Sequence, residues 1–336
     1  MLRSLSTLGL AAILAAPAMA QEVNLYSARH YDSDLRIYEN FTAQTGIRVN
    51  LIEGSDQQLL QRLQTEGINS PADLFITVDG GRLHKAVEAG VFQPAQSAVL
   101  EARVPEAFQH PDNLWFGLSA RARVIFYAND TGRPEWLNDY EDLADPRLEG
   151  EICIRSSSNI YNISLMAEMI DALGAEGAQD WAAGVVNNLA RAPQGGDRDQ
   201  LRALAAGECS VAVSNTYYWG ALAASENPAD TAVAEAVSFF YPNQSNRGAH
   251  VNISGVGVAA NAPNPENAVR FMEYLVSDEA QQIFADSNNE FPIVSGVTIT
   301  GPVAPYTEFL SSGVNVSVYG LNAAQATDIF DSVGFP

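Results

Sequence analysis

Tyrosines that could bind a metal ion occur in three separate segments of the chain. Each segment directly follows a short apolar run that is typical of a buried strand, at residues 22–26, 152–154 and 209–213. The side chains concerned are His30 and Tyr31, then Tyr161, then Tyr217 and Tyr218. A phenolate oxygen is a hard donor and suits a highly charged ion such as Fe(III). If the three segments face one cleft, four phenols and one imidazole could coordinate such an ion together.

The adjacent pair Tyr217 and Tyr218 requires a particular backbone. Neighbouring residues of an extended strand point to opposite faces, so both rings can act on one ion only if the strand has already ended. Asn215 is a typical helix cap, which predicts that the two tyrosines lie in a first helical turn. That turn would lie at the carboxyl end of a strand, where open α/β sheets usually bind ligands. A single tyrosine cluster is more often ordinary packing, so the prediction depends on all three segments together.

Regular alternation of strand and helix patterns predicts an α/β fold with two lobes. Residues 22–89 alternate three times between strand and helix, which is typical of a doubly wound parallel sheet. Apolar strands at 114–118 and 123–127 would then cross to a second lobe, and a strand at 237–241 would cross back. We therefore predict an interlobe cleft and two crossover strands. The expected lobes are 21–118 with 245–298, and 119–244 with 299–336.

The N-terminus and the charge indicate an exported protein. Residues 1–20 combine Arg3, an apolar core at 8–16 and a small-residue cleavage site, as signal peptides do. The formal charge of the chain is −22, and loss of Arg3 with the signal peptide makes it −23. No basic cluster occurs, which argues against nucleic acid or an anionic membrane as a partner. We expect a free protein in the periplasm of a Gram-negative bacterium.

Two cysteines, Cys153 and Cys209, are expected to form a structural disulfide. Each lies in a predicted strand, and the expected compartment is oxidising. A cysteine-based metal site is less well supported, because no Cys-x-x-Cys spacing occurs.

The order of several motifs resembles the iron(III) substrate-binding proteins of ABC importers. The motifs are Ala28-Arg29-His30-Tyr31, Arg121-Ala-Arg123-Val-Ile-Phe-Tyr127, Cys153-Ile-Arg155-Ser156 with Asn159-Ile-Tyr161-Asn162, and Gly207-Glu-Cys209 with Asn215-Thr216-Tyr217-Tyr218. They extend over essentially the whole mature chain. The resemblance implies a type II periplasmic-binding fold whose lobes close on a ferric ion. It also implies delivery of that ion to a membrane permease that an ATPase drives, by a protein that is usually monomeric.

The resemblance also implies a ligand set. Tyr161, Tyr217 and Tyr218 match the three iron ligands that the family shares. His30 and Tyr31 match the additional ligands of the branch that needs no synergistic anion, so carbonate or phosphate is not expected. Some members carry an arginine just after the tyrosine pair, whereas Trp219-Gly220-Ala221 follows it here. Arg29 or Arg121 would then offset the phenolate charge, and we expect Arg121. The motifs do not decide whether Fe(II) also binds.

Two alternatives remain open from the sequence. The tyrosines and Trp219 could enclose an organic cation, such as a polyamine or a thiamine-like molecule, by cation–π contact. Such a box would need an acidic residue, and none directly flanks Tyr161 or Tyr217. Alternatively, His30 and a tyrosine could serve as the acid–base pair of an enzyme. No Gly-x-Ser-x-Gly, His-Glu-x-x-His or paired-carboxylate motif supports that reading, so we expect no enzyme.

Overall fold

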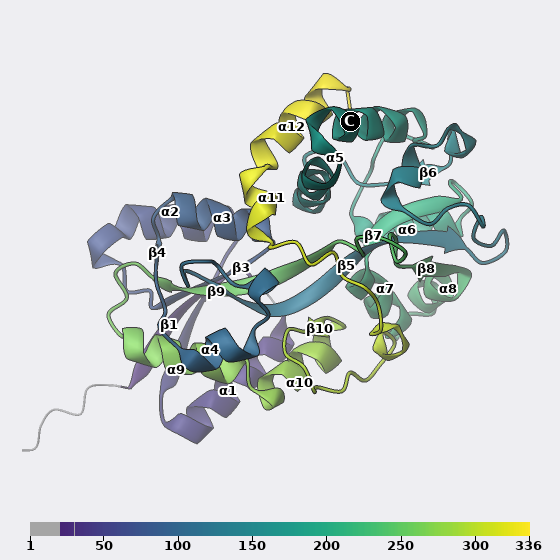
Figure 1. Cartoon of the computed structure of the whole chain (residues 1–336). Helices are drawn as coiled ribbons and strands as arrows, with labels where there is room; N and C mark the ends of the chain where they lie inside the picture. The colour runs from purple at the N-terminus through teal and green to yellow at the C-terminus, as the bar shows by residue number, and fades with distance from the viewer. Residues whose placement is uncertain (1–20, 30) are drawn as a thin grey trace, which may run out of the picture.

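The computed structural model of the chain describes residues 21–29 and 31–336. The predicted signal peptide, 1–20, and the predicted ligand His30 lie outside these residues. Within them the chain forms two lobes, and one long strand, β5 (Phe116–Ala128), extends through both (Figure 1). A continuous sheet path of order β2-β1-β3-β9-β5-β7-β6 runs through both lobes. Over the same described ranges, no helix has the length and apolar character that a membrane crossing requires.

The first lobe contains the three predicted strand–helix repeats. Its elements are β1 (Glu22–Ser27), α1 (Asp32–Thr45), β2 (Arg48–Glu53), α2 (Asp56–Glu66), β3 (Leu74–Val78) and α3 (Gly80–Glu88). Strand β1 pairs in parallel with both β2 and β3, but β9 (Val251–Ala259) lies antiparallel beside β3. The sheet is therefore mixed, and the prediction of a parallel sheet holds only for its first three strands.

Helix α1 shows how the sequence positions one element of this lobe. The buried side chains of Ile37, Tyr38 and Phe41 face the core, and the Tyr38 and Phe41 rings pack against Phe271 of α9 (Pro265–Leu275). Leu35, which the pattern placed on the same face, is instead 45% exposed. Successive residues of an α-helix are rotated by about 100° around its axis, so Leu35 lies roughly a third of a turn away from the buried side chains.

Strand β5 differs from the prediction of two strands at 114–118 and 123–127. It is one strand, because residues 119–122 are buried and continue the hydrogen-bonded ladder. Residues 116–122 pair with β9, and residues 123–128 pair with β7 (Val211–Asn215) and β8 (Val237–Phe240). The prediction that β8 itself crosses back was wrong, since it pairs within the second lobe. The return falls in the following segment, 241–250, before β9 begins.

The second lobe carries the predicted disulfide. Its further elements are β6 (Ile152–Cys153), α5 (Ile160–Asn187), α6 (Asp197–Ala205), α7 (Thr216–Ala223) and α8 (Pro228–Ala236). Helix α5 is broken at Gly174, where φ is 74° and ψ is 170°, so it forms the two helices that the pattern indicated. Cys153 is bonded to Cys209, which confirms the predicted pairing. Cys209 lies just before β7 rather than within a strand.

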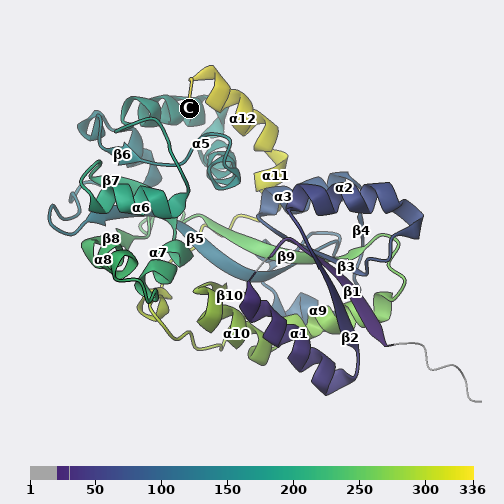
Figure 2. The same ribbon diagram turned by 180° about the vertical axis from the view of Figure 1, so that it is seen from behind.

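The C-terminal part of the chain connects the two lobes a third time. After β9 and α9, the elements α10 (Asp278–Asn288) and β10 (Phe291–Pro292) lie with the first lobe, as do the short β4 (Phe92–Gln93) and α4 (Ala98–Arg103) (Figures 1 and 2). Helix α11 (Ser317–Leu321) then packs against both α3 and α5, and α12 (Ala323–Ser332) packs along α5. This close approach requires Gly320, because a Cβ atom there would lie 2.0 Å from the His84 Cβ.

Candidate metal centre

Four of the five predicted ligands line one cavity between the lobes. Tyr31 precedes α1, Tyr161 lies in the first turn of α5, and Tyr217 and Tyr218 lie in the first turn of α7. All four line a cavity of about 590 Å³. The Tyr161 and Tyr217 hydroxyl oxygens are 3.2 Å apart, and the Tyr217 and Tyr218 ring centroids are 4.1 Å apart. The structure thus brings together tyrosines that are far apart in the sequence.

The tyrosine pair is presented by the helix start that the sequence predicted. Asn215 has an extended backbone and occupies the N-cap position of α7, so Tyr217 and Tyr218 lie in its first turn. The Asn215 side chain makes no capping hydrogen bond, which differs from the prediction. Its Oδ1 atom instead accepts a hydrogen bond from Arg123 at 3.0 Å. Asn159, at the start of α5, does cap its helix by accepting from the Tyr161 backbone N–H.

Burial controls the protonation of the phenols. Burial, followed by the neighbouring Tyr161, raises the pKa of Tyr217 well above the ordinary tyrosine value. The pKa of Tyr31 is also raised, by burial and then by the Glu290 carboxylate, and that of Tyr218 is raised by burial and then by Tyr161. These hydroxyls are therefore protonated at neutral pH in the metal-free protein. A cation that binds them as phenolates must displace their protons.

Two buried arginines lie beside the phenols but differ in their free hydrogen-bonding capacity. Arg29 is fully engaged: its guanidinium forms ion pairs with Asp34 at 2.8 Å and Glu290 at 3.0 Å, and also donates to Ser119 and Ser254. Its Cζ atom lies 4.9 Å from the centroid of the Tyr31 ring.

Arg121 makes far fewer contacts. Its Nη1 atom donates to Ser254 at 3.1 Å, whereas Nε and Nη2 are buried with no hydrogen-bond partner in the described part of the chain. Its Cζ atom lies 5.7 Å from the Tyr161 ring centroid. Burial acts to lower the pKa of Arg121, but the acidic side chains around it, including Tyr161 and Glu290, outweigh burial and raise it. Arg121 is therefore a buried cation with unused donors next to the phenols.

Sequence reasoning did not find the residues that complete the wall of the cavity. They come from the start of α6 and the end of α10, and include Gly196, Asp197, Arg198, Asp199, Arg202, Ser287, Asn288 and Asn289. The glycines before Asp197 are a turn signal that could have pointed to the start of α6. Both cavity carboxylates are paired with arginines, Asp197 with Arg123 and Arg155 and Asp199 with Arg202.

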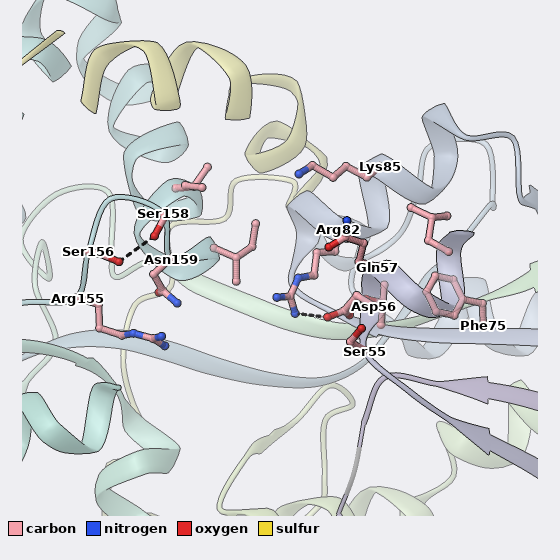
Figure 3. Close-up of a pocket in the computed structure, with 14 residues that line it drawn as sticks. Ser55, Asp56, Gln57, Phe75, Arg82, Lys85, Arg155, Ser156, Ser158 and Asn159 are labelled. Atoms are coloured by element: carbon pink, nitrogen blue, oxygen red, sulfur yellow. Dashed lines mark hydrogen bonds and ion pairs between the residues drawn. The ribbon is translucent and has the colours of Figure 1, made fainter. Parts of the chain in front are cut away.

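A second cavity, of about 690 Å³, opens at the same end of α5 and is shown in Figure 3. In Figure 3, Arg155, Ser156, Ser158 and Asn159 face Ser55, Asp56, Gln57, Arg82 and Lys85 across it. Arg82 forms an ion pair with Asp56 at 2.6 Å. None of the described residues that line this cavity is a tyrosine. The phenols thus belong to the first cavity.

Other common metal ligands do not gather elsewhere in the described ranges. No group of three or more histidine, cysteine, aspartate or glutamate side chains is arranged to hold an ion within residues 21–29 and 31–336. The tyrosine cavity therefore remains the site whose donors suit a hard cation.

Comparison with known proteins places this chain and its fold in a family. Residues 69–312 match the family described as bacterial extracellular solute-binding protein. Iron uptake protein A1 of Synechocystis sp. is 50% identical over 319 residues, which cover 95% of this chain and 89% of that protein. The structure of a Trichodesmium IdiA (FutA) protein in complex with iron and citrate ligands has 50% identity and a TM-score of 0.92, covering 94% of this chain and 100% of that chain.

A further similar structure is the ferric binding protein from Campylobacter jejuni. Its identity is 42% and its TM-score is 0.87, covering 94% of this chain and 100% of that chain. The chain belongs to the bacterial extracellular solute-binding proteins, and its fold is the two-lobed type II periplasmic-binding fold. These relatives are named as iron-binding or iron-uptake proteins, which confirms the resemblance based on the tyrosine motifs. They place the chain among binding proteins rather than enzymes.

Proposed function

We propose that this protein captures ferric iron for uptake and holds it through the phenolates of Tyr31, Tyr161, Tyr217 and Tyr218. The observation that carries the proposal is the convergence of these four side chains on one cavity, with the Tyr161 and Tyr217 oxygens 3.2 Å apart. We assign His30, beside Tyr31 in the sequence, as the fifth ligand. The names of the similar proteins, which include an iron and citrate complex, support iron as the cargo.

The charges around the cavity fit a ferric ion bound by phenolates. Four phenolates and a neutral imidazole would leave Fe(III) with one net negative charge. Arg121 offsets that charge in our proposal, because it has unused guanidinium donors and lies beside Tyr161. Arg29 is less suited, since Asp34 and Glu290 already neutralise it. A synergistic anion is not required by this arrangement.

Movement of the lobes would assemble the site. We place the lobes at 21–118 with 245–298 and at 119–244 with 299–336. Tyr31 then comes from the first lobe and the other three tyrosines from the second. Strand β5 exchanges its pairing partners between Ala122 and Arg123, which supports a hinge near that point. Closure about it would bring Tyr31 to the iron last.

Export and delivery complete the proposal. Residues 1–20 would direct the chain to the periplasm of a Gram-negative bacterium and be removed. A monomer carrying iron would then dock on the permease of an ABC importer in the inner membrane. The extracellular character of the family supports this location.

A visible-absorption titration with ferric citrate tests the ligand assignment. Phenolate-to-iron(III) charge transfer gives an orange-red band, which we expect to saturate at one iron per chain. The Tyr217→Phe variant keeps the ring but loses the oxygen, so the band and tight binding should be lost. Tyr306→Phe, at a tyrosine outside the cavity, is the control and should behave like the parent. A protein that stays colourless with ferric iron would contradict the proposal.

The organic-cation alternative predicts a different outcome for the same variant. A cation–π box would survive Tyr217→Phe, because phenylalanine retains the face of the ring. The cavity wall argues against that alternative, since Asp197 and Asp199 are both paired with arginines. Thermal-shift screening of polyamines and thiamine would detect such a ligand, because a ligand that binds only the folded protein raises its melting temperature.

A further inference from the structure

Arg123 lies at the meeting point of the three segments that surround the second-lobe tyrosines. It is fully buried on β5, two residues beyond Arg121 and thus on the same face of the strand. Its Nη2 atom donates to Asn162 Oδ1 at 2.6 Å. Its Nη1 atom donates to Asp197 Oδ1 at 2.9 Å and to Asn215 Oδ1 at 3.0 Å. One guanidinium therefore bonds to residues from α5, α6 and the end of β7.

Each of these acceptors belongs to a segment that presents a cavity residue. Asn162 directly follows Tyr161, and its Nδ2 atom donates to the carbonyl oxygens of Arg155 and Ser156 at 2.6 and 3.1 Å. It thereby fixes the loop from which α5 starts. Asn215 ends β7 two residues before Tyr217. Asp197 is the first residue of α6 and lines the cavity itself.

We propose that Arg123 is a positioning residue that fixes Tyr161, Tyr217 and Tyr218 relative to one another before iron arrives. The planar guanidinium can donate to several acceptors in fixed directions, whereas a lysine ammonium is a point charge without this fork. Arg123 does not touch the ion. It sets the separation of the phenols, and small displacements of ligating groups weaken a site strongly. This inference rests on the proposed function.

A purely structural role would be neutralisation of the buried Asp197. That carboxylate has a second cation, because its Oδ2 atom also accepts from Arg155 Nη1 at 3.0 Å. Arg123 also donates to the neutral amides of Asn162 and Asn215, and charge neutralisation does not explain these two hydrogen bonds. Positioning of the tyrosine-bearing segments accounts for the ion pair with Asp197 and for the two hydrogen bonds to the amides.

The test compares Arg123→Lys with Arg247→Lys, the same change at an ion pair outside the cavity. Arg247 pairs with Glu141, so the control also replaces a guanidinium fork by an ammonium. We measure iron release to a strong chelator, the charge-transfer band and the melting temperature of the metal-free protein. Arg123→Lys should release iron at least about tenfold faster and shift or weaken the band. Arg247→Lys should leave release within about twofold of the parent.

Two additional measurements keep the proposal testable. Asn215→Ala removes one acceptor of Arg123 without removing a helix cap, and should accelerate release to a smaller extent than Arg123→Lys. A crystal structure of metal-free Arg123→Lys should show the Tyr161 and Tyr217 oxygens no longer within hydrogen-bonding distance. If Arg123→Lys does not fold, unchanged release by Asn215→Ala overturns the proposal.

Other outcomes are equally decisive. Parent-like release, band and phenol contact in Arg123→Lys would overturn the proposal, and so would equal acceleration by Arg247→Lys. If the parent protein gives no tyrosine-dependent band, the proposed function fails. The distance between the Tyr161 and Tyr217 hydroxyl oxygens in crystals of metal-free Arg123→Lys would then still decide whether Arg123 positions the tyrosines.

Discussion

At the scale of single residues, the protein combines strong potential ligands with an environment that keeps them protonated. Burial raises the pKa of Tyr31, Tyr217 and Tyr218, so each phenol resists ionisation until a cation replaces its proton. Ferric iron has the charge to do this, whereas a weakly charged cation does not. The same burial that makes the empty site inert thus contributes selectivity for a hard, highly charged ion.

Iron binding should therefore weaken as the pH falls. Each phenol whose pKa lies above neutral releases one proton when iron binds, so protons compete with iron at every pH below that pKa. Affinity should fall by up to about tenfold per released proton for each pH unit. Competition with a chelator of known affinity between pH 6 and 8 measures the slope, and calorimetry in two buffers counts the protons. A pH-independent affinity would contradict phenolate ligation.

Replacing Arg121 should weaken iron binding without removing the colour. At about 6 Å and an effective dielectric constant of about 20, a guanidinium stabilises one phenolate by roughly 2–3 kcal/mol, which corresponds to roughly 100-fold in affinity. Arg121→Met should lose about that much, whereas Arg121→Lys retains the charge and should lose less. Equilibrium competition with citrate measures both. If the parent and Arg121→Met bind iron with equal affinity, Arg121 does not compensate the phenolate charge.

The residue types and their order predicted the tyrosines that meet in the cavity. The sequence favoured Arg121 over Arg29, but it did not contain the physical reason, which is that carboxylates occupy the guanidinium donors of Arg29 and not those of Arg121. Glu290 and Asp34 engage Arg29, and Glu290 is distant in the chain. His250 likewise has a buried partner, Glu168, that no local pattern indicated.

At the scale of elements, the disulfide holds together two segments that support the site. Cys153 ends β6, ahead of the loop to Tyr161, and Cys209 precedes β7, which leads to Tyr217. Cross-linking at a sequence separation of 56 restricts the unfolded chain, which is worth about 4 kcal/mol in the chain-entropy model.

Removing this disulfide should lower stability more than it alters iron binding. The Cys153→Ser, Cys209→Ser double variant should lose up to about 4 kcal/mol of unfolding free energy, because its unfolded state is less restricted. Below its melting temperature it should still give the charge-transfer band. Urea denaturation of the metal-free forms measures the loss, and reduction of the parent by dithiothreitol should reproduce it. An unchanged free energy of unfolding would show that the disulfide does not stabilise the folded protein.

A buried contact between Glu168 and His250 is linked to the C-terminal helix α11 by a tyrosine hydroxyl. Glu168 of α5 lies 2.5 Å from His250 Nδ1 and accepts from the Tyr319 hydroxyl of α11 at 3.0 Å. Burial acts to raise the pKa of Glu168, but His250 and the hydrogen bonds to the carboxylate together outweigh burial, so the pKa is lowered. A lowered carboxyl pKa contributes stability above the unfolded value of about 4.3, and this contribution disappears as the pH falls through the folded value.

Glu168→Gln should therefore destabilise the protein near neutral pH and change its acid response. Breaking one side of a buried pair costs roughly 3–5 kcal/mol. The difference from the parent should be complete at pH 7 and shrink as the pH falls from about 4 through the lowered pKa of Glu168, where the parent carboxylate also becomes protonated. Urea denaturation across pH 3–7 measures it, with Glu176→Gln on the exposed part of α5 as the control. A constant difference at all pH values would refute this account of the pair.

The sequence predicted the elements better than their connections. Alternating apolar patterns located β1 to α3 correctly, because each element has its own hydrophobic periodicity. The continuity of β5 was missed since residues 119–122 are small or charged, and only pairing with β9 and burial of Arg121 make them a strand. The antiparallel position of β9 likewise depends on distant partners.

At the scale of the whole molecule, two lobes share one sheet path and enclose the tyrosine cavity between them. Tyr31 lies on one side of the proposed hinge and Tyr161, Tyr217 and Tyr218 lie on the other. An ion that binds all four must hold the lobes together, which is how a binding protein can signal its loaded state to a permease. Helix α11 contacts α3 of the first lobe and α5 of the second, so it must accommodate that movement.

The most direct test of this account is a crystal structure of the iron-loaded protein with anomalous data collected at the iron absorption edge. The account predicts one strong anomalous peak within coordination distance of the hydroxyl oxygens of Tyr31, Tyr161, Tyr217 and Tyr218. A peak held by carboxylates, or one in the second cavity beside Arg82 and Lys85, would contradict the central claim.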